Sequence, residues 1–460
     1  MNRLNHNFSP KFLHFLWGDL SQKEVKKFSI LSCIITIILG NYWMLRVMKN
    51  PIFNDLVGMS FQPYAKIFSM LTIVVVMLGY SKLVDLFGKK TLFDIVCAFY
   101  AIILMLLSIV TTYPEYFSIS NTEIPSLFSW IPGKLIGWFA YFTLESISLI
   151  TILFWSFVSS TTDTESAKKG YPFMVGCLQI GTISGPFIVT LLAPQVGVPT
   201  LILVSSFVVM FIPILIRLYL NHFPSESLIN KNKSNGIRNT KTGFLEGLKL
   251  IITKPYVMGI LVISVIYESI STILEFQMSM IAKDIFTTRD IFATFTGKLG
   301  SSINGLAFCF ALLGTSFFIR KLGLRICLIA YPVIIGCVLL TLLIVNFIGA
   351  TNYQTMWSLF TSVLVIKGCS YALNNPIKEI IYIPTSTDIR FKSKGWIETF
   401  GRKGSKSLAS FVNISFSKNI SELFLFGTIL SLGIVGGWII IANMLGKKFN
   451  TLQTKRLIIS

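Results

Sequence analysis

The sequence predicts an all-α membrane protein with twelve transmembrane helices arranged in two six-helix halves. Its 460 residues are 53% hydrophobic and 13% charged, whereas a soluble domain carries about 25% charged residues. The mean hydropathy is +0.71. The apolar residues fall into repeated runs of about 20 or more, the length that a helix needs to cross a bilayer. These observations argue against a soluble enzyme.

Twelve apolar runs have the length of a membrane span. The first is longer than the apolar core of a signal peptide and lacks a clear small-residue cleavage site, so we expect it to be retained. Polar or charged residues between the runs mark the connecting loops. The expected spans are 27–47, 64–84, 91–111, 133–159, 170–194, 197–221, 255–282, 298–319, 325–349, 355–383, 396–418 and 422–446.

One long polar connection divides the spans into six plus six. Its first part, Pro224 to Lys241, is rich in Ser, Asn, Lys and Gly and is typical of a flexible linker. Its second part, 244–252, has apolar residues at helical spacing beside a charged face, which predicts a helix on the membrane surface. The expected organisation is a cytoplasmic N-terminal segment at 1–26, an N-terminal half at 27–221, a cytoplasmic linker at 222–254, a C-terminal half at 255–446 and a cytoplasmic tail at 447–460.

Basic residues outnumber acidic residues by 40 to 20 and gather on alternate loops. The opposite loops are nearly free of them, since 112–132 contains Glu115 and Glu123 but no Lys or Arg. Because basic residues collect on the cytoplasmic side of membrane proteins, we expect both termini in the cytoplasm and the chain in a cell (inner) membrane. The lipid bilayer thus explains most of the positive charge, and no nucleic-acid partner is expected.

The residue types that carry enzymatic chemistry are sparse. The seven cysteines lie singly in apolar runs, with no CxxC and no neighbouring histidine, and we interpret them as small buried apolar residues. The sequence has no GxxxxGK[ST] motif, so ATP hydrolysis is not encoded. We therefore expect a secondary transporter with no metal and no cofactor, driven by exchange or by an ion gradient.

The loops after the second and eighth spans share a glycine among basic residues. The first, Ser81 to Lys90, resembles the Gly-x-x-x-Asp-x-x-Gly-basic-basic loop of the major facilitator superfamily, with Ser81 in place of the first glycine. The second, Arg320 to Arg325, follows the corresponding span of the other half. The resemblance implies two repeated halves around a central site that is reached from alternate sides. The alternative is that glycine and basic residues are simply common in cytoplasmic turns.

Several charged residues lie inside the expected spans, where each costs at least about 2.5–3.5 kcal/mol on insertion scales. Cations outnumber carboxylates among them, which favours an anionic substrate with several charges. Arg grips phosphate through two parallel hydrogen bonds and Lys supplies a point charge, so a polyphosphate fits. Trp155 or Tyr371 could stack on a base, although packing is the commoner role of such residues. The charges singled out within the expected spans or at their ends are Arg46, Lys49, Glu145, Glu268, Glu275, Lys367, Lys378, Glu379, Glu398, Arg402, Lys403 and Lys406.

Some of these charges could have a structural role in place of a binding role. Glu145 and Glu275 lie deep in their spans and are expected to be functional or ion-paired, whereas Glu268 could instead be protonated and structural. The 402–406 cluster could extend a cytoplasmic loop. Four residues lie near expected span ends and could reach the interface by snorkelling, namely Arg46, Lys49, Lys378 and Glu379.

Several segments together resemble the nucleotide translocase family of obligate intracellular bacteria and plastids, which comprises ATP/ADP antiporters and nucleotide-uptake carriers. The matching segments are spread over nearly the whole chain. Their common order and spacing are more specific than any one of the motifs. The segments are Asn41 to Lys49, Phe154-Trp155 with Glu165 to Lys169, Phe244 to Lys249, Leu274-Glu275, Lys367-Gly368 with Tyr371, Lys378 and Glu398, and Gly401 to Ser407.

The resemblance implies functional charges at Lys49, Glu275 and Lys406, and less directly at Glu145, since the glutamate of the family falls where this chain has Thr143. The chain also departs from the family pattern. Asn50 and Asn375 replace common aspartates, and Leu408-Ala409 replaces a Gly-Gly pair. These changes bear on ATP/ADP preference more than on nucleotide transport itself.

We therefore predict ATP/ADP-type nucleotide exchange by alternating access, in a monomer from an intracellular bacterium or a similar organism. The alternatives are a proton-coupled nucleotide symporter and a major facilitator carrier of another organic phosphate. The predicted substrate-binding residues are Arg46, Lys49, Glu145, Glu275, Lys367, Lys378, Lys403, Lys406 and Ser407.

Overall fold

A computed structural model of the chain describes residues 21–87, 89–113, 134–223, 244–313, 321, 323–386, 389, 393–417, 419–455 and 457–459. Over these ranges it is almost entirely helical, apart from an isolated bridge between Thr385 and Ile459. Some predicted features lie outside the described residues, namely the segment before residue 21, the acidic loop around Glu115 and Glu123, the linker from Pro224 to Lys241, Gly88, Arg320 and Arg390.

The N-terminal half contains the first six predicted spans. The fifth and sixth form one continuous stretch, α7, with a kink at Gly197, whose φ of 79° lies in the left-handed region that favours glycine. The helices of this half are α2 (Gln22–Leu56), α3 (Gln62–Leu86), α4 (Lys89–Thr112), α5 (Leu135–Ser146), α6 (Leu149–Thr161) and α7 (Thr164–His222), with a 3-10 turn, η1 (Met59–Phe61), before α3.

Helix α2 is longer than its predicted span of 27–47. It begins at Gln22 after a capping box in which Ser21 and Glu24 satisfy each other's backbone N–H groups. It then continues to Leu56, so Arg46 and Lys49 lie inside the helix and not at its end. The helix end on which the snorkelling alternative was based therefore lies beyond these two residues.

The predicted span 133–159 is broken into two helices. Helix α5 ends at Ser146 and α6 begins at Leu149. The buried Tyr100 hydroxyl of α4 donates to the Ser146 carbonyl oxygen at 3.0 Å, which satisfies one backbone group freed by the break. The break places Glu145 in the last turn of a short helix.

The C-terminal half contains the other six predicted spans, two of which include π-helical turns. Such turns are rare and are often found at functional sites. The elements of this half are α8 (Phe244–Thr253), α9 (Pro255–Ile285), α10 (Arg289–Leu313), α12 (Leu324–Phe347), α13 (Asn352–Cys369), the π turn η4 (Ser370–Asn374), α14 (Asn375–Ile381), α15 (Lys394–Trp396), the π turn η6 (Ile397–Gly401), α16 (Arg402–Phe416) and α17 (Ile420–Thr454).

Eight of the described helical stretches are long and apolar enough to cross a membrane, and one of them, 165–222, contains two predicted spans. The predicted spans 298–319, 355–383 and 396–418 are not among these eight. All three carry polar or charged side chains, which lower their hydropathy. The all-α membrane class is confirmed, and the number twelve remains a prediction.

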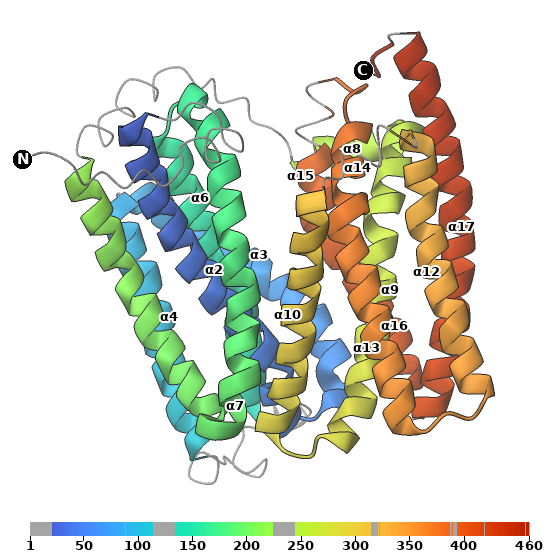
Figure 1. Cartoon of the computed structure of the whole chain (residues 1–460), viewed down its shortest axis with the longest axis horizontal. Helices are drawn as coiled ribbons and strands as arrows, with labels where there is room; N and C mark the ends of the chain where they lie inside the picture. The colour runs from blue at the N-terminus through green and yellow to red at the C-terminus, as the bar shows by residue number, and fades with distance from the viewer. Residues whose placement is uncertain are drawn as a thin grey trace, which may run out of the picture.

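The two halves stand side by side, and α2 begins at the same face at which α17 ends (Figure 1). Each half has its own apolar core. Within the N-terminal half, a Cβ at Gly181 of α7 would meet the Thr36 carbonyl of α2, so small residues allow these helices to approach closely. The halves meet where α3 packs on α16 and where α10 packs on α7 and α2.

Candidate functional site

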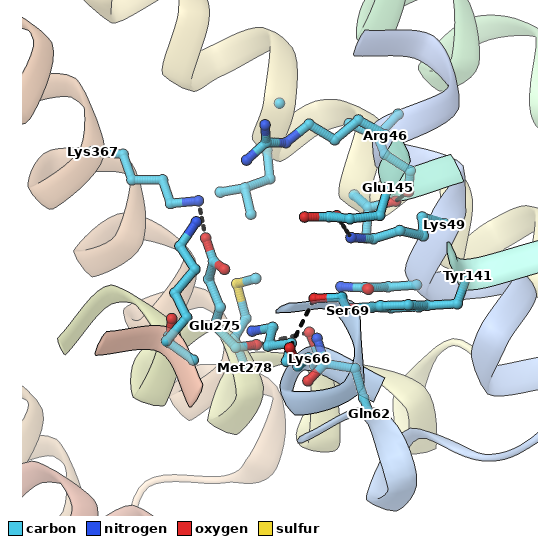
Figure 2. A pocket seen from close by; sticks show the side chains of 18 of the residues that line it. Arg46, Lys49, Gln62, Lys66, Ser69, Tyr141, Glu145, Glu275, Met278 and Lys367 are labelled. Atoms are coloured by element: carbon cyan, nitrogen blue, oxygen red, sulfur yellow. Dashed lines mark hydrogen bonds and ion pairs between the residues drawn. The ribbon is translucent and has the colours of Figure 1, made fainter. Parts of the chain in front are cut away.

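A cavity lies between the halves and has about 1010 Å³ of empty space, part of it open to solvent. Figure 2 shows it from close by. Helices α2, α3 and α5 contribute side chains from one half, and α9, α10, α13 and α16 from the other. Two carboxylates, Glu145 and Glu275, line it. Six cations also line it, namely Arg46, Lys49, Lys66, Lys367, Lys403 and Lys406.

Glu145 joins the two halves through its carboxylate. Lys49 of α2 donates to it at 2.6 Å, and Lys403 of α16 donates to its other oxygen at 2.7 Å. The predicted ion pairing of Glu145 is thus confirmed. Thr143, the alternative position for this glutamate by resemblance, is buried and does not line the cavity. Glu145 thus contacts a cation from each half.

Glu275 forms the second pair within the cavity, and its carboxylate contacts the ammonium group of Lys367. Figure 2 shows the two side chains meeting across the cavity wall. They come from α9 and α13, so this pair lies inside the C-terminal half. The predicted ion pairing of Glu275 is also confirmed.

Glu268 lies behind the wall, where its side chain is only 7% exposed. It accepts from Arg402 at 2.5 Å and from Lys406 at 3.2 Å. Glu268 therefore has two cationic partners. A protonated, structural Glu268 would instead require a site without such partners. Arg402 and the other cations of 402–406 belong to α16 and point to protein partners, so the alternative that they extend a loop is wrong.

Arg46 differs from the paired cations because its described partners are aromatic. Its guanidinium donates to the Tyr42 hydroxyl at 2.7 Å and lies 4.8 Å from the centre of the Trp43 ring. Trp43 and Tyr141 both line the cavity, and the Lys49 ammonium lies 4.3 Å from the Tyr141 ring centre. Such contacts hold a cation over an aromatic face.

The sequence reasoning missed three polar residues that line the cavity from α3, namely Gln62, Lys66 and Ser69. Their spacing of four and then three residues places them on one face of a helix. Most of the surrounding helix is apolar, so the spacing was a usable signal. Lys66 lies inside the expected span 64–84, close to its beginning.

The structure does not bring four of the suggested residues to this cavity. Ser407 is buried, and its hydroxyl lies 3.9 Å from the Met70 sulfur, because it falls on the face of α16 that packs on α3. Lys378 is on α14, beyond the π turn. Trp155 packs edge-to-face on Tyr171 at 5.6 Å. Tyr371 also lies outside the lining.

Comparison with known proteins gives a match along almost the whole chain. A family model described as TLC ATP/ADP transporter matches residues 2–449. ADP,ATP carrier protein 3 of Rickettsia bellii (strain RML369-C) is 23% identical over 454 residues, which cover 88% of this chain and 90% of the relative. ADP,ATP carrier protein 1 of Rickettsia prowazekii (strain Madrid E) is 23% identical over 456 residues and covers 90% of both chains.

Solved structures of transporters share the fold at low sequence identity. A bacterial homologue of the iron transporter ferroportin in an inward-facing state has a TM-score of 0.62 and 10% identity, covering 91% of this chain and 100% of that one. The nucleoside transporter NupG has a TM-score of 0.59 and 14% identity, covering 92% and 99%. These two transporters carry different substrates, so the likeness concerns the fold, which is of the major facilitator type.

Proposed function

The chain belongs to the TLC ATP/ADP transporter family, and from this premise we propose that it exchanges ATP for ADP, or a closely related pair of nucleotides, across a cell membrane. It is a secondary transporter and not an enzyme. The observation that carries the proposal is the cavity between the halves, where six cations face two carboxylates. That excess of positive charge suits a polyphosphate group.

The ion pairs support exchange as the mode of transport. Glu145 contacts Lys49 and Lys403, and Glu275 contacts Lys367. Closing the cavity around these groups would remove water from more cations than the carboxylates can neutralise, which is costly. Bound phosphates would supply the missing negative charge. The loaded carrier would therefore reorient readily and the empty one slowly, as an exchanger requires.

The contacts between the halves indicate which side is closed. Arg289, at the start of α10, donates to Asp55 at 3.2 Å and to the Thr111 carbonyl oxygen at 3.1 Å. Asp290 accepts from the Val198 backbone N–H at 2.9 Å. These groups lie at the far ends of α2 and α4 and beside the kink of α7, opposite the face where α2 begins (Figure 1).

The apolar contacts gather at the same end of the molecule. Met59, just beyond α2, is part of the core of the C-terminal half, and Ala293 of α10 is part of the core of the N-terminal half. Figure 1 shows the halves diverging toward the face where α2 begins. The loop charges predict that both termini lie in the cytoplasm. On that prediction, the divergence supports a state that is open to the cytoplasm and closed on the outside.

We expect Arg289→Ala to open the outer side, because Arg289 holds two elements of the other half across this closure. A single cysteine at position 69, in a background without the native cysteines, would report access from outside through labelling by a membrane-impermeant maleimide. The labelling rate should rise about fivefold, as expected for losing roughly 1 kcal/mol of contacts at a partly exposed pair.

The control for this experiment is Arg217→Ala, which breaks the Arg217–Asp94 ion pair within the N-terminal half. That variant should leave labelling unchanged. The charge-exchanged double variant Asp55→Arg/Arg289→Asp should restore part of the closure. Equal labelling in Arg289→Ala and in the unmodified protein would show that this contact does not close the outer side.

The proposed function is tested by uptake of radiolabelled ATP and ADP into bacteria that express the protein, with unlabelled nucleotides as competitors. An arm with preloaded nucleotide measures counter-exchange, which should accelerate uptake. Uptake that a protonophore abolishes in the absence of nucleotide on the other side would favour symport instead. If no nucleotide is taken up or competes, the result would favour a carrier of another organic phosphate.

A further inference from the structure

The polar face of α3 is the part of the cavity that the ion pairs leave unexplained. Gln62 and Ser69 are buried, and Lys66 lies between them in sequence and on the same helical face. In Figure 2 the Lys66 side chain lies lower in the view than the Glu275–Lys367 contact and the Lys49–Glu145 pair, next to Met278. Lys66 therefore lines the same cavity as both ion pairs, from the α3 side.

The cations of the cavity differ in what holds them. Lys49 and Lys403 contact Glu145, Lys367 contacts Glu275, and Lys406 contacts Glu268. Arg46 has the Tyr42 hydroxyl and two aromatic rings. The Lys66 ammonium, by contrast, makes no hydrogen bond or ion pair with any part of the chain that the structure describes.

An ammonium group at membrane depth without a partner is costly and is usually functional. Ser69 does not relieve that cost, because its hydroxyl donates to the backbone carbonyl of Lys66 at 2.7 Å and not to the side chain. Each of the other cavity lysines already contacts a carboxylate, so a ligand phosphate would compete with that carboxylate for the ammonium group. Lys66 can bind a phosphate oxygen without breaking any existing pair.

We propose that Lys66 is a phosphate-binding residue that makes the affinity of the carrier depend on the number of substrate phosphates. This inference rests on the proposed function for the identity of the natural substrate. The recognised chemistry is a chain of phosphates, and the base plays no part in it. Lys66 should therefore favour a triphosphate over a diphosphate and should not distinguish adenine from guanine.

The test is calorimetric binding of ATP, ADP, GTP and inorganic tripolyphosphate to the purified full-length protein in detergent at low salt. In Lys66→Ala, binding of ATP and tripolyphosphate should weaken at least about tenfold, the equivalent of one full charge contact. The affinity for ADP should decrease by a smaller factor, and the ratio of the ATP affinity to the GTP affinity should stay constant. Lys66→Arg should recover most of the binding.

Lys298→Ala is the matched control. Lys298 is also a lysine within a helix, α10, but its side chain is exposed on the same helical face as the exposed Ile291. It should bind all four ligands like the unmodified protein. Thermal unfolding of each variant in detergent separates misfolding from lost binding. A folded Lys66→Ala protein that binds tripolyphosphate and ATP normally would overturn the inference.

The two proposals can fail separately. If the unmodified protein binds tripolyphosphate, Lys66→Ala weakens that binding, and no nucleotide is exchanged, then the nucleotide function is wrong and the phosphate site stands. If the unmodified protein exchanges nucleotides and Lys66→Ala does so with unchanged KM, the phosphate site is wrong and the function stands. Absence of any binding to the unmodified protein would overturn both.

Discussion

Nucleotide exchange by Glu145→Gln is expected to fall by about 100-fold while the protein remains folded in the membrane. Glu145 is the shared partner of Lys49 and Lys403, at 2.6 and 2.7 Å. The amide keeps the size of the side chain but leaves two cations unpaired, and removing one partner from a buried pair costs about 3–5 kcal/mol. Because Glu145 is partly exposed, we use the lower end of this range, about 3 kcal/mol. Counter-exchange of labelled ADP in proteoliposomes measures the loss.

The control for this variant is Glu379→Gln, because Glu379 pairs with Lys394 at 2.7 Å outside the cavity and is 59% exposed. An exposed pair contributes little, so exchange should change by less than about threefold. The double variant Glu145→Gln/Lys403→Gln should recover part of the loss, since it removes one unpaired charge. Exchange by Glu145→Gln within twofold of the unmodified protein would contradict the proposed role.

Lys406→Ala is expected to abolish nucleotide uptake. Lys406 lines the cavity and is positioned by Glu268, whose carboxylate lies 3.2 Å from it. Arg402 lies 2.5 Å from the same carboxylate, so Glu268 should keep a charged partner in the variant and the wall should remain intact. The lost function can then be assigned to the cavity, with a decrease of at least about 100-fold for a cation that binds phosphate directly.

Uptake of labelled ATP into expressing bacteria checks this expectation, with the amount of protein in the membrane measured in parallel. Lys168→Ala serves as the comparison, since Lys168 pairs with Glu165 at an exposed site where its side chain is 67% accessible. That variant should transport normally. Near-normal uptake by Lys406→Ala would remove Lys406 from the binding site.

Much of the fold follows from hydropathy, because a run of apolar side chains long enough to cross a bilayer forms a helix wherever it lies in the chain. The ends of the helices are less predictable. Arg46 and Lys49 interrupt the apolar run of the first span, and the prediction stopped there, yet α2 continues to Leu56. These two charges line a cavity on one side of α2. The sequence around them gives no sign of that cavity.

The break between α5 and α6 also depends on distant residues. Nothing in the run from 133 to 159 interrupts its apolar character except Glu145 and small polar residues. The break becomes tolerable because Tyr100 of another helix donates to the Ser146 carbonyl. Glu145, whose carboxylate contacts Lys403 of α16, lies one residue before this break.

The sequence by itself determined the membrane class, the approximate positions of the spans and a set of charges that needed partners. Tertiary structure alone decided which charges meet, because Glu145 and Lys403 are 258 positions apart and a pattern along the chain has no information about that distance. It also separated Lys403 and Lys406, which face the cavity, from Ser407, which faces α3. Tertiary structure also placed Lys66 in the cavity. The role proposed for Lys66 depends on its ammonium group having no partner among the described residues, and only the packing of the helices shows which partners a side chain has.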